Sequence, residues 1–267
     1  VGYAIQRFIA KDLERTHRLD ELGIDLERPQ VSLVGVPETL KRAKGMFAFA
    51  CWDTRESELW LARDRFGEKP LYYGLCRGSL VFASELKALR AFPGFAPDID
   101  RNALCEYLRW TNVPSPMTIY EGVQKLPPAH FVRIGEVGAL PKPHPYWSAI
   151  DTARAQPNIQ VGVDEVDGLA EVLDQAVSTQ MVADVPIGAF LSGGIDSSSL
   201  VASMQRLSST PIRTFTVGFS EAGYDESQYA AEVAAALGTD HTEIVVSPED
   251  AMRVIPELPT IYDEPFA

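Results

Sequence analysis

The chain has little cysteine and little histidine among its 267 residues. Its three cysteines, Cys51, Cys76 and Cys105, are odd in number, and their spacing fits neither a zinc site nor a disulfide framework. The four histidines are scattered along the sequence. We therefore predict neither a disulfide-stabilised secreted domain nor a histidine-based metal cluster, and we expect a cytoplasmic protein.

Long apolar runs and an excess of basic residues are also missing. No apolar segment approaches the length of a membrane span, and no signal peptide opens the chain. Lysine and arginine number 24 against 37 aspartates and glutamates, which gives a net charge of −13 and argues against nucleic-acid binding. An anionic ligand would therefore depend on local hydrogen-bond donors.

The most informative segment that is present is the hexapeptide S-G-G-I-D-S at residues 192–197. It follows an apolar run over 186–191, which we interpret as a strand, and precedes residues 198–204, which read as the opening of a helix. A tight Gly-Gly turn between a strand and a helix N-terminus directs backbone N–H groups to one spot, where the helix dipole adds partial positive charge. This pattern predicts an anion site.

The side chains of the hexapeptide narrow the expected ligand. Its serines add hydroxyl donors, but the carboxylate of Asp196 should repel a phosphate unless a divalent cation bridges the two. The loop thus predicts a site for the pyrophosphate of a nucleotide together with Mg²⁺ at Asp196. The other common phosphate loop, G-x-x-x-x-G-K-[ST], is absent. The competing interpretation is an ordinary turn rich in serine and glycine.

The two halves of the chain differ in their expected secondary structure. The first half predicts a buried strand over 45–53 that forms a hairpin with 58–64, paired strands over 71–74 and 79–84, and helices over 85–91 and 100–110. Residues 119–146 read as irregular with short strands, and Arg63, Asp64 and Lys69 as a structural Arg–Asp pair at a turn. We expect an antiparallel, sandwich-like block.

From Val163 onward, strands alternate with helices. An amphipathic helix comes first, followed by the strand and loop of the hexapeptide. Strands over 213–219 and 241–246 flank a helix that we expect Asp225 to cap and Gly238 to end. This alternation predicts a parallel sheet with the hexapeptide at the carboxyl end of a strand, where such sheets bind ligands.

Motifs of one family occur in order along both halves. The first half contains G-M-F-A-F-A-C-W-D at 45–53, A-R-D-R-F-G-E-K-P-L-Y-Y at 62–73 and F-A-S-E-L-K-A-L at 82–89. The second half contains D-V-P-I-G-A-F-L at 184–191, leading into the hexapeptide, and Y-D-E-P-F-A at 262–267. Over residues 35–267 the chain resembles the glutamine-hydrolysing asparagine synthetases.

This resemblance implies a two-domain fold. Residues 35–150 would be part of an α+β class II glutaminase sandwich of the N-terminal-nucleophile type, and residues 163–267 part of an α/β, parallel-sheet ATP-pyrophosphatase domain. Residues 151–162 would link them, and residues 1–34 are unassigned or divergent.

The resemblance also implies a reaction. An asparagine synthetase, a carbon–nitrogen ligase, activates aspartate with ATP as β-aspartyl-AMP and then transfers nitrogen from glutamine or ammonia to it. The implied partners are therefore small molecules, with Mg²⁺ as the metal and neither nucleic acid nor membrane, and a homodimer is left open.

The implied site residues fall into two groups. The ATP-binding group, with Asp196 as the Mg²⁺ ligand and Leu191 and Val217 against adenosine, comprises Leu191, Ser192, Gly193, Gly194, Ile195, Asp196, Ser197, Ser198 and Val217. Asp263 and Glu264 are assigned to the aspartate or magnesium side of the pocket. The competing interpretation of this last pair is a solvated loop.

The sequence departs from the family pattern at both ends. The family nucleophile is an N-terminal cysteine, whereas this chain begins Val1-Gly2, so the catalytic residue of the glutaminase is unknown. The chain stops at Ala267, where a synthetase domain should continue. We expect an internal fragment that by itself hydrolyses no glutamine and forms little or no asparagine.

Two other functions fit the same motifs. One is an amidotransferase or cyclase of a natural-product or polysaccharide pathway, which would share the pyrophosphate loop but use another acceptor or amine. The other is a non-catalytic nucleotide-binding module. Tight MgATP binding without release of pyrophosphate would indicate the module, and the glutaminase motifs after Gly45 favour the asparagine synthetase over the other enzyme.

Overall fold

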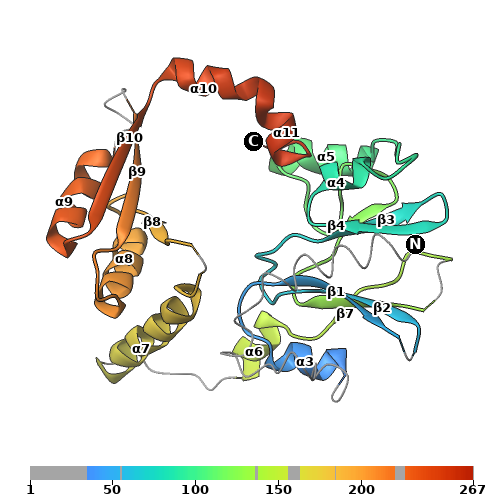
Figure 1. Cartoon of the computed structure of the whole chain (residues 1–267), viewed down its shortest axis with the longest axis horizontal. Coiled ribbons are helices and arrows are strands. Elements are labelled where there is room, and N and C mark those ends of the chain that lie inside the picture. Colours follow the sequence, from blue (N-terminus) through green and yellow to red (C-terminus); the bar gives the residue numbers. More distant parts are fainter. Residues whose placement is uncertain are drawn as a thin grey trace. The chain divides into compact units, whose positions relative to one another are not determined.

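The computed structural model describes residues 35–54, 56–135, 138–155, 163–183, 185–219 and 226–266, which form two compact units. The first unit consists of the described residues up to 155 together with those from Leu258 onward. The second consists of the described residues from Val163 to Glu257. Figure 1 shows the elements of both units, coloured along the sequence. Residues 1–34, unassigned by sequence, lie outside the described residues.

The larger sheet of the first unit has the strand order β1-β2-β6-β7. Strands β1 (Ala48–Asp53) and β2 (Glu58–Arg63) pair antiparallel, which confirms the predicted hairpin. Strand β6 (His130–Ile134) pairs with the other edge of β2, and β7 (His144–Pro145) pairs with β6. The chain thus returns from a distant segment to complete this sheet.

The smaller sheet has the order β4-β3-β5. Strands β3 (Tyr72–Cys76) and β4 (Ser79–Ala83) form the second predicted pair, and β5 (Val123–Lys125) joins the free edge of β3. Helix α4 (Leu86–Arg90) follows β4. Asp100 caps the N-terminus of helix α5 (Arg101–Trp110), because its carboxylate accepts hydrogen bonds from two N–H groups of the first turn.

The two sheets of the first unit share a hydrophobic core. Its buried members include Leu61 of β2, Val132 of β6 and Tyr73 of β3. The predicted burial of strand 45–53 is wrong in degree, because β1 is only half-buried and Trp52 keeps 42% of its surface exposed. Helix α3 (Val36–Arg42), which we did not predict, packs Leu40 close to Phe49.

The turn after β2 is organised by a buried carboxylate. Asp64 is 1% exposed and accepts backbone N–H groups from Phe47 at 3.3 Å, Phe66 at 3.1 Å, Glu68 at 2.9 Å and Lys69 at 3.0 Å. Burial alone would raise the pKa of Asp64, but these four donors outweigh it and hold the pKa below its ordinary value.

Arg63 binds backbone carbonyl oxygens of the same region, whereas Asp64 binds backbone N–H groups. Its guanidinium donates to the carbonyl oxygens of Gly67 at 2.6 Å, Lys69 at 2.8 Å and Leu126 at 2.7 Å. The predicted structural role is confirmed, although Arg63 and Asp64 each bind backbone groups, and no direct ion pair joins them in the described structure.

The second unit contains a parallel sheet of order β10-β9-β8, formed by β8 (Gly188–Phe190), β9 (Arg213–Phe219) and β10 (Asp240–Val246). Helices α7 (Val163–Gln180), α8 (Ile195–Leu207) and α9 (Ser227–Leu237) contribute Val177, Val201 and Ala230 to a core shared with the sheet. The predicted alternation of strands and helices is confirmed (Figure 1).

Individual helix ends differ from their predictions. Helix α8 starts at Ile195, inside the hexapeptide and before the predicted Ser198. Gly238 ends α9 in a left-handed conformation with φ of 69°, as predicted, whereas Asp225 lies outside the described residues. Residues 151–155, where the linker was expected to begin, belong to helix α6 (Ala149–Ala155).

The chain closes with three short elements. These are α10 (Pro248–Val254) and η2 (Ile255–Glu257) in the second unit and α11 (Leu258–Tyr262) in the first. None of the described helices combines the length and the apolar character that a membrane crossing requires.

We predict that Asp64→Asn lowers the free energy of unfolding by about 2–4 kcal/mol near neutral pH, because an amide leaves buried N–H groups without an acceptor. The depressed pKa of Asp64 means that its contribution exists above the ordinary aspartate pKa, and is lost as pH falls through the lowered folded value. Urea unfolding of both proteins at about pH 7 and about pH 3 should show the difference shrinking in acid. The exposed Asp98 provides a control, Asp98→Asn, expected to change stability by less than about 0.5 kcal/mol.

Candidate functional site

The hexapeptide starts just after β8 in the second unit, and the preceding residue, Leu191, is anchored by hydrogen bonds and by the core. The N–H of Leu191 donates to the carbonyl oxygen of Phe215 at 2.9 Å and extends the pairing of β8 with β9 by one residue. Its carbonyl oxygen accepts the hydroxyl of Thr216. The Leu191 side chain is 1% exposed and lies in the core.

Two serine hydroxyls close the loop on itself. The Oγ of Ser197 accepts the N–H of Ser192 at 3.2 Å, lies 3.0 Å from the Oγ of Ser192, and donates to the carbonyl oxygen of Gly194 at 3.2 Å. The beginning of the loop is therefore tied to the first turn of α8. These hydrogen bonds constrain the path of the loop.

Gly193 brings the loop against the backbone of a neighbouring helix. Its φ is +76°, and a Cβ added there would lie 2.7 Å from the Cβ of Tyr229 and 2.9 Å from the backbone nitrogen of Ala230. Only glycine fits this approach to α9. Gly194, the N-cap of α8, has an extended backbone, and its added Cβ would come no closer than 3.4 Å to the Oγ of Ser192.

The N-terminus of α8 is open to a ligand. The first helical hydrogen bond is from the N–H of Ser198 to the carbonyl oxygen of Gly194, at 3.0 Å. The preceding N–H groups of Ile195 and Asp196 find no acceptor among the described residues. The hydroxyl oxygen of Ser198 is likewise buried without a described partner. Unpaired donors at the positive end of a 13-residue helix form an arrangement that binds anions.

Asp196 is the acidic residue of this helix turn. Its side chain is exposed and makes no hydrogen bond or ion pair with the residues that the structure describes. Within that part of the chain, no group of three or more potential metal ligands occurs. Magnesium usually keeps several waters and is bound through one or two carboxylates together with substrate phosphates. A single free carboxylate beside an anion-binding loop fits an ion that arrives with a nucleotide.

The two residues predicted to contact adenosine differ in accessibility. The side chain of Leu191 is occupied in the core, so only its backbone is available to a ligand. Val217 is 42% exposed, and on β9 it alternates with the buried Thr216. Its side chain therefore points away from the core formed with α8 and α9.

Asp263 and Glu264 belong to the first unit, while the Ser192–Ser198 residues are gathered in the second. The Oδ2 of Asp263 accepts the backbone N–H of Lys87 at 3.1 Å. The carboxylate of Glu264 pairs with the ammonium of Lys125. Their side chains are only 7% and 11% exposed, so the interpretation as a solvated loop is wrong.

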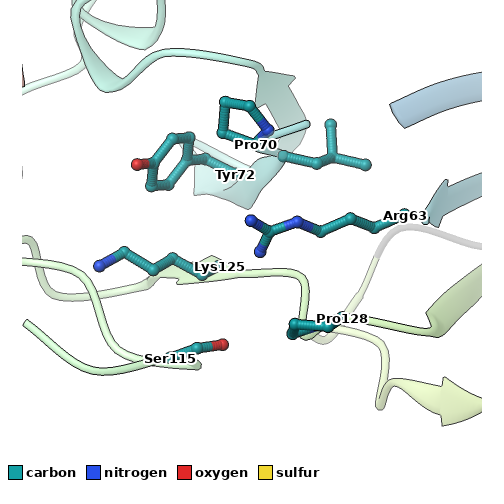
Figure 2. Close-up of a pocket in the computed structure, with 7 residues that line it drawn as sticks. Arg63, Pro70, Tyr72, Ser115, Lys125 and Pro128 are labelled. Atoms are coloured by element: carbon teal, nitrogen blue, oxygen red, sulfur yellow. The ribbon is translucent and has the colours of Figure 1, made fainter. Parts of the chain in front are cut away.

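A cavity of about 310 Å³ in the first unit is lined in part by Lys125, the partner of Glu264. Figure 2 shows the guanidinium of Arg63 reaching into the space between Tyr72 and Lys125. Burial, followed by the nearby carboxylate of Glu264, raises the pKa of Tyr72 to about 12, so its phenol stays protonated at neutral pH. We did not predict this cavity, because segments far apart in the sequence form its walls.

Two family models match the chain in succession. The glutamine amidotransferase domain matches residues 30–147, and asparagine synthase matches residues 168–267. The chain carries a glutamine amidotransferase domain followed by an asparagine synthase domain. The resemblance seen in the motifs is thereby confirmed.

Similar proteins of known sequence are named asparagine synthetases or amidases. A Mycobacterium tuberculosis protein provisionally named asparagine synthetase (glutamine-hydrolysing) is 40% identical over 237 residues, which cover 86% of this chain and 35% of that protein. Asparagine synthetase (glutamine-hydrolysing) 1 of Bacillus subtilis is 36% identical over 231 residues, with the same coverage. Amidase chry2 of Gibberella zeae is 33% identical over 239 residues, covering 84% of this chain and 35% of that protein. The chain spans about a third of the length of these relatives.

We predict that Gly193→Ala markedly lowers the midpoint of thermal unfolding, because the added Cβ would meet helix backbone that cannot rotate away. Together with the left-handed backbone, this should cost about 2–4 kcal/mol. The matched variant Gly194→Ala adds the same methyl group one residue later, where space exists, and should cost under about 1 kcal/mol. Equal destabilisation by the two substitutions, measured by calorimetry, would contradict the close approach to α9.

Proposed function

We propose that the complete gene product synthesises asparagine from aspartate, with ATP as the activating substrate and glutamine or ammonia as the nitrogen donor. The observation that carries this proposal is the closed Ser192–Ser197 loop, which leads into the open N-terminus of α8 at the carboxyl end of a parallel strand. The asparagine synthase and glutamine amidotransferase matches support the choice of substrates.

In the proposed reaction, a β-carboxylate oxygen of aspartate attacks the α-phosphorus of ATP and pyrophosphate leaves. Ammonia then attacks the acyl carbon of the adenylate, AMP departs with that oxygen, and a proton is lost from nitrogen. Adenylation is needed because a carboxylate oxygen is otherwise a poor leaving group.

The loop would stabilise the negative charge of the departing pyrophosphate. The unpaired N–H groups of Ile195 and Asp196 and the dipole of α8 would stabilise it, since their donors are already oriented. The buried hydroxyl of Ser198 offers a further donor. We assign the exposed Val217 side chain and the Leu191 backbone to adenosine.

Asp196 would hold Mg²⁺, which when bound supplies positive charge to the phosphates. The carboxylate itself would otherwise repel a triphosphate at the loop. The assignment of Asp263 and Glu264 to the aspartate side stays part of the proposal.

The proposal also covers the fold of the first unit and the cellular compartment of the protein. We interpret the two antiparallel sheets and their shared core as a glutaminase sandwich of the N-terminal-nucleophile type. The three cysteines are free, which fits a reducing cytoplasm.

A second candidate function is amide formation on another carboxylic acid. The similarity to a protein named Amidase chry2 supports it, because that name indicates amide chemistry and does not specify aspartate. Both candidates use the loop in the same way and differ in the acceptor.

The test is to incubate the complete gene product with MgATP, ammonium and aspartate labelled with heavy oxygen in its β-carboxylate. We expect pyrophosphate release that depends on aspartate, and transfer of the label to AMP. Release that requires another carboxylic acid would favour the second candidate. Tight ATP binding without any pyrophosphate would support a non-catalytic nucleotide module instead.

We predict that Asp196→Asn lowers kcat/KM for MgATP by about 100-fold and raises the Mg²⁺ concentration needed for half-maximal rate, because the loop loses its metal-binding charge. The exposed Asp167 of α7 provides the control, and Asp167→Asn should leave both values within about twofold. An unchanged Mg²⁺ requirement in the Asp196 variant would remove this residue from the metal site.

A further inference from the structure

The last described residues of the asparagine synthase match belong to the other compact unit. The match runs over residues 168–267, yet the segment from Leu258 to Phe266 is part of the unit that contains the amidotransferase match. Most of the polar contacts that hold this segment are made by its two adjacent carboxylates, Asp263 and Glu264.

Both oxygens of Glu264 are engaged. One pairs with the ammonium of Lys125, and the other accepts the backbone N–H of Ile119 at 3.3 Å. The ammonium also donates to the carbonyl oxygen of Val113 at 2.5 Å. The Lys125 and Glu264 side chains are 15% and 11% exposed. The carboxylate is therefore held in one orientation by groups fixed to β5 and the preceding loop.

Lys87 holds the neighbouring carboxylate. Its backbone N–H, at the start of α4, donates to the Oδ2 of Asp263, and its ammonium lies 3.7 Å from the Oδ1. The same ammonium donates to the carbonyl oxygen of Thr260 at 2.9 Å. Asp263 has a φ of +65°, a left-handed conformation that is uncommon for residues other than glycine and persists only when its surroundings impose it.

The cost of burying charges indicates more than a stabilising role for the pair of Lys125 and Glu264, whereas the Lys87 side chain is 37% exposed. A largely buried ion pair adds little net stability, because desolvation offsets the attraction between the charges. What such a pair provides is a defined position for each partner, since losing one leaves the other as an uncompensated buried charge.

We propose that Lys125 is a positioning residue for Glu264 in the synthase reaction. Lys125 lies within the amidotransferase match and Glu264 within the synthase match, so one domain would set the geometry of a carboxylate that belongs to the other. This inference rests on the proposed function, in which the two carboxylates serve the aspartate side.

The test uses Lys125→Met in the complete gene product. Methionine keeps much of the side-chain volume and removes the charge. We expect kcat for aspartate-dependent pyrophosphate release with ammonium to fall by about tenfold or more, while KM for MgATP stays within about twofold. Lys125→Arg should recover much of the rate, because a guanidinium also pairs with a carboxylate. The exposed Lys142 gives the control Lys142→Met, for which no change is expected.

A merely structural role predicts a different pattern. In that case Lys125→Met would weaken MgATP binding and slow the reaction together, and arginine would not restore the rate; this result would overturn the proposal. Absence of aspartate-dependent pyrophosphate release from the unmodified protein would instead refute the proposed function, and the positioning role with it.

Unfolding measurements test the ion pair separately from activity. We expect the double variant Lys125→Met/Glu264→Gln to be more stable than Lys125→Met alone, because the second change removes an unpaired buried charge. Additive destabilisation by the two single changes would show that the residues are not coupled, and would refute the positioning of Glu264 by Lys125.

Discussion

The contact between Gly193 and the backbone of α9 is the constraint on which the candidate nucleotide site depends. The loop can turn toward the N-terminus of α8 only because its Cα approaches Tyr229 and Ala230 with no side chain in between. The serine hydroxyls then close a loop whose path is already set by packing. Donors for an anion are thus oriented by the fold, which lowers the entropy that binding would have to remove from the loop.

In the first unit, charged side chains hold segments of the chain in place by hydrogen bonds to backbone groups. Asp64 binds four N–H groups and Arg63 three carbonyl oxygens, so the turn after β2 is held by two adjacent residues of opposite charge that serve separate partners. The charges of Asp64 and Arg63 are thus satisfied by backbone dipoles whose positions the fold sets, which defines the side chains more closely than a surface ion pair would. Asp263 also accepts a backbone N–H, at the start of α4, but its Oδ1 is buried without a hydrogen bond in the described structure.

Much of the fold was predictable from local patterns. The hairpin of β1 and β2, the pairing of β3 with β4 and the three parallel strands follow from apolar periodicity and turn residues. The partners of β6 and β5 did not follow, because they pair with β2 and β3 across long stretches of chain that carry no local signal. The half-exposed β1 escaped prediction for a similar reason, since burial depends on what packs above a strand.

The amino-acid sequence by itself determined the chemistry of the candidate site: a Gly-Gly turn, two serines and an aspartate between a strand and a helix, which local backbone and side-chain properties suffice to indicate. Only the tertiary structure decided which side chains are accessible and what Asp263 and Glu264 contact. Leu191 is taken up by the core, and the two carboxylates are held by lysines more than a hundred residues earlier in the chain. Such contacts depend on the packing of distant segments, and neither spacing nor residue type specifies that packing.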